Sequence, residues 1–128
     1  MALSLIGLGE IEKIPEQAIL ANADPDDADQ DGISGKANRV YDISIKQWRL
    51  GRFTRKASSP SVKQQVGQAM HHDMGLTTPL IRHDNCTRTQ KDCLSAVREG
   101  EIDVPELRLD AVLFYITHLN VPEQRNPE

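Results

Sequence analysis

The stretch that divides this chain reads Asp24-Pro25-Asp26-Asp27-Ala28-Asp29-Gln30-Asp31-Gly32-Ile33-Ser34-Gly35-Lys36-Ala37-Asn38. Five carboxylates occupy the eight positions from Asp24 to Asp31, and they repel one another unless a cation gathers them. Aspartate, proline and glycine are also residues that turns favour, so the stretch is predicted to be a loop. Regular elements are therefore expected on either side of it.

The spacing of the aspartates predicts a calcium loop. From Asp27 the string Asp-x-Asp-x-Asp-Gly matches positions 1 to 6 of an EF-hand loop. The predicted oxygen ligands are Asp27, Asp29, Asp31, the carbonyl of Ile33, and Asn38. A full EF-hand has a bidentate glutamate where Asn38 stands, so affinity is expected to be modest unless Asp24 and Asp26 contribute. The alternative is a solvated acidic turn that holds no metal.

The composition predicts one domain with a thin core. The chain has 128 residues, 38% of them hydrophobic, with two Phe, two Tyr and one Trp. We expect residues 1–122 to form a single domain or a fragment of a larger protein, and residues 123–128 to form a polar tail. The net charge is −4 and the basic residues do not cluster, which argues against a nucleic-acid partner. No apolar run approaches the ~20 residues of a membrane span.

The two cysteines, Cys86 and Cys93, are separated by six residues. This spacing is neither a C-x-x-C redox pair nor half of a familiar zinc site. A short-loop disulfide is the simplest use of the pair, and it would place the chain in an oxidising compartment. Two free thiols, or a dithiol redox enzyme, are the alternatives.

Before the loop, apolar residues at helical spacing predict a helix from Leu5 to Ile14, and Pro15 begins a second short helix. After it, the β-prone residues between Arg39 and Phe53 predict a small hairpin.

Two longer helices are expected in the second half. Ser59 and Pro60 form an N-cap and first position, and this helix should stop near Gly75. A polar loop follows to about residue 90, and Pro105 then begins a last helix that ends before Pro122. The predicted class is mainly α, with short helices, long loops and a small β-hairpin.

Candidate chemistry is limited to histidine and methionine side chains. His71 and His72 end the helix that begins near Ser59, where the helix dipole favours a cation, so capping is the simpler interpretation. The alternative makes His71, His72 or Met74 a haem-pocket residue. Covalent attachment of haem c by this chain is excluded because no C-x-x-C-H motif is present.

The residues that carry a family resemblance are spread over nearly the whole chain. They are Gly7-Leu8-Gly9 with Ile11 and Ile14-Pro15, Ala23 to Asn38, Leu50-Gly51-Arg52-Phe53 with Lys56-Ala57, Gln65, Asp73 to Leu80, Phe114-Tyr115, and Leu119-Asn120-Val121-Pro122. In order and spacing this set resembles the di-haem c-type oxidoreductases, a peroxidase-like family once described as thiol oxidoreductases. The family shows Gly-Trp after Gly-Arg-Phe, whereas this chain has Thr54-Arg55, so Trp48 is the substitute candidate for an aromatic electron relay.

The resemblance implies a fold, a parent protein and a set of partners. The chain would be a cytochrome c-like or di-haem peroxidase-like segment of a bacterial, periplasmic protein, with one haem-attachment motif on either side of it. The aspartate loop would bind Ca²⁺ between haem domains, and residues 73–80 would line a haem pocket. The flanking haem domains and an electron-donor protein would be its partners, and the segment alone would be inactive. The alternative function is an extracytoplasmic calcium-binding interaction module without redox activity.

Overall fold

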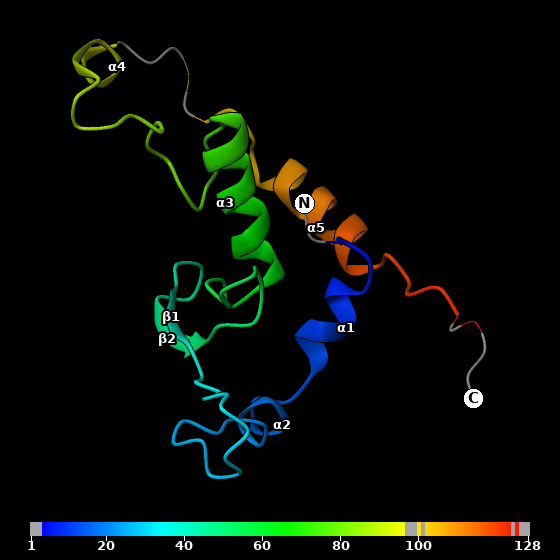
Figure 1. Ribbon diagram of the computed structural model, residues 1–128. Coiled ribbons are helices and arrows are strands. Elements are labelled where there is room, and N and C mark those ends of the chain that lie inside the picture. The colour runs from blue at the N-terminus through cyan, green and yellow to red at the C-terminus, as the bar shows by residue number, and fades with distance from the viewer. Residues whose placement is uncertain (1–3, 97–99, 101, 124, 126–128) are drawn as a thin grey trace.

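The computed structural model describes residues 4–96, 100, 102–123 and 125 (Figure 1). Over these residues the elements in chain order are α1 (Leu8–Lys13), α2 (Glu16–Leu20), β1 (Arg39–Asp42), β2 (Gln47–Leu50), α3 (Val62–Met74), α4 (Lys91–Ser95) and α5 (Glu106–Thr117). The predicted polar tail at 123–128 lies almost wholly outside the described residues. No described helix has the length and apolar character needed to cross a membrane.

The prediction of a mainly α, cytochrome c-like segment is wrong. Helices hold 35% of the described residues and strands with isolated bridges hold 10%, so loops make up the majority. Helices α1, α2 and α4 have only five or six residues each. Helices of that length are not stable by themselves in water, and the intervening Pro, Gly and Asp residues stop them from growing.

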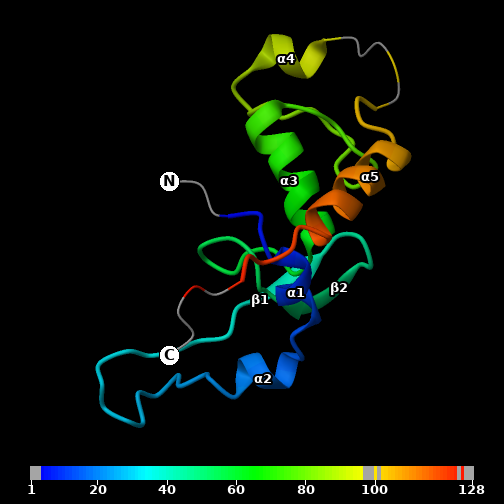
Figure 2. The same ribbon diagram turned by 90° about the vertical axis from the view of Figure 1, so that its right-hand side faces the viewer.

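Three helices surround the core. Helices α1, α3 and α5 contact one another, while α2 and α4 lie at opposite ends of the molecule (Figures 1 and 2). The buried apolar cluster consists of Leu8, Phe53, Val62, Val66, Leu109 and Ile116. A core of this size agrees with the low aromatic content of the sequence.

Helix α3 begins two residues later than predicted. Its N-cap is Ser61, whose Oγ accepts a hydrogen bond of 3.2 Å from the Gln64 backbone N–H. Ser59 is unavailable as a cap because its backbone pairs with Phe53 in an isolated bridge. The helix ends as predicted at Gly75, which adopts the left-handed conformation with φ of 70°.

The predicted hairpin is confirmed. Strands β1 and β2 pair antiparallel, with Arg39 opposite Leu50 and Asp42 opposite Gln47. The Gln64 side chain joins this hairpin to α3, since it accepts from the Ile43 backbone N–H at 2.8 Å and donates to the Tyr41 carbonyl at 3.1 Å. Burial would raise the pKa of Asp42, but hydrogen bonds from Ser44 and Arg49 outweigh that effect and lower it.

Two glycines of the family pattern mark points of close backbone approach. A Cβ on Gly9 would lie 2.1 Å from the carbonyl oxygen of Thr117, at the contact of α1 with α5. A Cβ on Gly51 would lie 1.7 Å from the carbonyl oxygen of Ala57. Only glycine fits at either position.

The loop after Phe53 is strained. Thr54 has φ of 72°, a left-handed conformation that is unfavourable for a β-branched residue. Its hydroxyl lies 2.7 Å from that of Ser58 and accepts from the Ser58 backbone N–H at 3.1 Å. Glycine adopts a positive φ without the steric cost that a β-branched residue bears.

Two substitutions measure this strain. Thr54→Gly and Thr54→Ala both remove the hydroxyl, so the difference between them isolates the backbone. Allowing for the greater freedom of glycine in the unfolded chain, we expect Thr54→Gly to be more stable than Thr54→Ala by about 1 kcal/mol in urea unfolding. Equal stability of the two variants would show that the backbone at Thr54 is not strained.

Candidate functional site

The acidic stretch forms a closed loop. Asp24 and Gly35 exchange two backbone hydrogen bonds of 2.9 Å, which join its ends. Inside the loop, aspartate side chains accept hydrogen bonds from backbone N–H groups. These pairs are Asp24 with Ala28, Asp27 with Gly32, Asp29 with Asp31, and Asp31 with Ile33. The aspartate side chains therefore stabilise the conformation of the loop as well as giving it a negative charge.

Three of these carboxylates converge. One oxygen each of Asp24, Asp27 and Asp29 lies within 4.8 Å of the others, which is close enough for the three to share one cation. Of the predicted set, Asp27 and Asp29 belong to this group, and Asp31 does not. Asp24 was expected only as a supplementary ligand.

The last two predicted ligands, Ile33 and Asn38, are placed as follows by the structure. Ile33 is exposed at the surface of the loop. Asn38 donates its side-chain amide to the carbonyls of Lys56 and Ala57 at 3.1 and 3.0 Å. Its amide therefore anchors the strained loop that contains Thr54.

His71 is buried, with 3% of its surface exposed, and its Nδ1 has no hydrogen-bond partner among the described residues. The rings of His72 and His83 each lie 5.0 Å from its ring, centroid to centroid. Burial lowers the pKa of His71, the cationic forms of His72 and His83 lower it further, and Asp84 opposes the change. A neutral, buried imidazole does not act as the cationic helix cap that the simpler interpretation expected.

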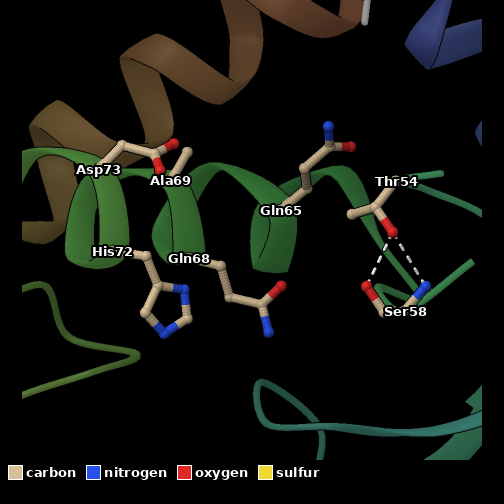
Figure 3. A pocket seen from close by; sticks show the side chains of 7 residues that line it. All are labelled: Thr54, Ser58, Gln65, Gln68, Ala69, His72 and Asp73. Atoms are coloured by element: carbon tan, nitrogen blue, oxygen red, sulfur yellow. Dashed lines mark hydrogen bonds between the residues drawn. The ribbon is translucent and has the colours of Figure 1, made fainter. Parts of the chain in front are cut away.

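His72 lines a hollow on one side of α3. Figure 3 shows His72 and Gln68 on the same side of α3. Thr54, hydrogen-bonded to Ser58, lies at one end of this hollow. The hollow has a volume of about 360 Å³. Its lining is about equally polar and apolar, whereas cofactor pockets are lined predominantly by apolar side chains.

Met74 lines another hollow, which is apolar. It lies between the N-terminal segment, α3 and α5, with Met70, Val112 and Ile116 among its walls. Its volume of about 210 Å³ is below the ~300–1,000 Å³ typical of cofactor pockets. Of the predicted haem residues, His71 and His72 are in ring contact, while His72 and Met74 line different hollows and His71 lines neither of these two.

Cys86 and Cys93 are joined by a disulfide, with their Cα atoms 5.9 Å apart. Cys93 belongs to the short helix α4, at the end of the molecule farthest from the acidic loop (Figures 1 and 2). Trp48, the substitute candidate for an electron relay, is exposed on β2, and its ring meets the ring of Tyr41 at 5.8 Å.

Comparison with known proteins identifies the family. A family described as "Di-haem oxidoreductase, putative peroxidase" matches residues 1–128. The chain therefore belongs to the di-haem oxidoreductases, as its sequence resemblance predicted. No curated protein and no solved structure matches it.

His71 should make the fold sensitive to acid. Because its folded-state pKa is lowered, the unfolded chain takes up a proton first as the pH falls below about 6.5, and the free energy of unfolding falls with it. His71→Phe should flatten the dependence on pH of the free energy of unfolding measured in urea, between pH 7 and 5, by at most about 1.4 kcal/mol per pH unit. An unchanged slope would contradict the assigned direction of the shift.

Proposed function

We propose that this chain is a haem-free segment of a di-haem c-type oxidoreductase with peroxidase-like activity. One observation carries the proposal. A di-haem family matches the chain from end to end, yet the chain has no C-x-x-C-H motif and its two cysteines are bonded to each other. Neither cysteine is then available to hold a haem, so the two haems are assigned to other parts of the same polypeptide.

In this proposal the segment positions the haem domains and performs no chemistry alone. The haems supply one-electron chemistry, and peroxide or an oxidisable partner is the substrate. Residues 1–122 act as one unit between the haem domains, and an electron-donor protein is the external partner. The disulfide supports a periplasmic location, because such bonds persist in oxidising compartments.

The test is the haem content of the natural full-length protein. Purified from a bacterial periplasm, it should carry two covalently attached haems per polypeptide and oxidise an electron donor in a peroxide-dependent reaction. The 128-residue chain expressed in the same compartment should carry none. A natural gene that lacks C-x-x-C-H throughout would overturn the proposal.

We further propose that the acidic loop binds Ca²⁺ through Asp24, Asp27 and Asp29. The three converging carboxylate oxygens and the hard-cation preference for oxygen support it. Calcium held there would fix the loop that lies between α2 and the hairpin. Calcium binding in a protein that carries no haem would favour the alternative function, an extracytoplasmic interaction module.

Calcium should raise the thermal midpoint of the 128-residue chain by mass action. At a free concentration one hundred times the dissociation constant, the stabilisation is about 2.7 kcal/mol. Asp29→Asn should abolish the increase, because it removes one of the converging charges. Asp26→Asn is the matched control, since it removes a charge from the same loop outside the group of three, and it should retain most of the increase. A midpoint that is unchanged in millimolar calcium would exclude the site.

A further inference from the structure

The β1–β2 hairpin presents aromatic and apolar side chains to solvent. Trp48 on β2 is 68% exposed, its cross-strand partner Tyr41 is 43% exposed, and Ile45 in the turn between the strands is 49% exposed. Trp48 is the only tryptophan of the chain, while the buried apolar cluster of the described residues holds one aromatic ring, that of Phe53. A protein with so thin a core thus keeps its largest apolar side chain outside it, beside two others, which is typical of an interaction surface.

The same region of the chain is basic. Between residues 32 and 72 the single acidic residue is Asp42, which is buried and paired with Arg49. This span contains eight of the 15 lysine and arginine residues of the chain. Those that are exposed on the hairpin and in the segments just before and after it are Lys36, Arg39, Lys46, Arg55 and Lys56. The local excess of positive charge departs from the expectation, based on the whole chain, that the basic residues do not cluster.

The hairpin is a fixed projection. The buried carboxylate of Asp42 accepts hydrogen bonds from the backbone N–H and the hydroxyl of Ser44 in the turn, at 2.9 and 2.5 Å. Gln64 of α3 holds the backbone of Tyr41 and Ile43, as described above. Figure 2 shows the turn at the edge of the molecule, on the opposite side from the acidic loop. Hairpin residues line neither of the two hollows described above. The surface is therefore suited to a partner that it can enter.

We propose that this hairpin docks on the surface of an anionic lipid bilayer, with Trp48, Tyr41 and Ile45 among the headgroups. Tryptophan and tyrosine are enriched where a membrane meets water, because their rings are apolar and their N–H and O–H groups are polar. Exposed lysines and arginines beside them are attracted to anionic headgroups. A bilayer offers both negative charge and an apolar layer, whereas a nucleic acid offers no such layer. The binding is peripheral, and the inference does not depend on the haem assignment.

Tryptophan fluorescence of the 128-residue chain with lipid vesicles tests the proposal. Because Trp48 is the only tryptophan, its emission reports on the hairpin directly. Vesicles of phosphatidylcholine and phosphatidylglycerol should shift the emission to shorter wavelength in a saturable way, and added salt should weaken this binding. Pure phosphatidylcholine vesicles should bind at least tenfold more weakly, since they lack the anionic headgroups. Phosphatidylcholine with brominated acyl chains, mixed into the anionic vesicles, should quench Trp48.

Matched variants locate the surface. Lys46→Gln should weaken binding to anionic vesicles about fivefold, because it removes one charge near the bilayer. Lys91→Gln removes an exposed charge from α4 and should leave binding unchanged. Ile45→Ser should also weaken binding about fivefold, because it removes apolar surface that the headgroup region would cover. Its control is Ile33→Ser, which changes an exposed isoleucine of the acidic loop and should have no effect.

Three results would overturn the proposal. The first is an emission that anionic vesicles leave unchanged, or that pure phosphatidylcholine vesicles shift equally well. The second is a loss of binding in Lys91→Gln and Ile33→Ser as large as in Lys46→Gln and Ile45→Ser, which would place the contact outside the hairpin. The third is tighter binding of a single-stranded oligonucleotide than of anionic vesicles, without quenching by brominated lipid, which would indicate a nucleic-acid surface.

Discussion

Two charged side chains hold the short helix α1 in place, and the arrangement of the three core helices depends on them. Glu12 accepts a 3.0 Å hydrogen bond from the Val62 backbone N–H, one of the donors that the first turn of α3 leaves unpaired. The Arg52 guanidinium donates to the carbonyls of Ile11, Glu12 and Ile14 where α1 ends. A helix of six residues that buries only Leu8 and Gly9 needs such partners. The apolar cavity exists because α1 and the segment before it are held beside α3 and α5.

Local signals predicted the regular elements except the short helix α4, and they predicted the fold class poorly. Pro15, Gly75 and Pro105 mark helix boundaries because they act through their own backbones, and the structure places boundaries at each of them. The cap of α3 moved from Ser59 to Ser61 because Ser59 pairs with Phe53, a contact between segments that helix signals do not contain. The expected mainly α class failed for a related reason. The prediction was based on short segments with helical periodicity, but most of the residues between those segments form loops.

For the candidate sites too, the sequence predicted what local geometry determines and missed what contacts between segments determine. The aspartate spacing identified the loop and two of the three converging carboxylates, since those positions follow from local geometry. The bridge between Asp24 and Gly35, and the hydrogen bonds from the Asn38 amide nitrogen to Lys56 and Ala57, are contacts between segments that the aspartate spacing does not contain. Gln65 entered the sequence prediction only as part of a family pattern. Its side-chain oxygen is buried with no hydrogen-bond partner among the described residues, which local sequence signals do not reveal.

Membership of a di-haem family and the absence of any haem-attachment motif from these residues are the two observations behind our proposal that the chain is a haem-free segment. The most direct measurement is a peptide map of the natural full-length protein, with each haem-bearing peptide located by mass. Every haem should lie on a peptide outside residues 1–128, and Cys86 and Cys93 should appear as one disulfide-linked pair without haem. A haem attached to Cys86 or Cys93 would contradict the assignment of this segment as haem-free.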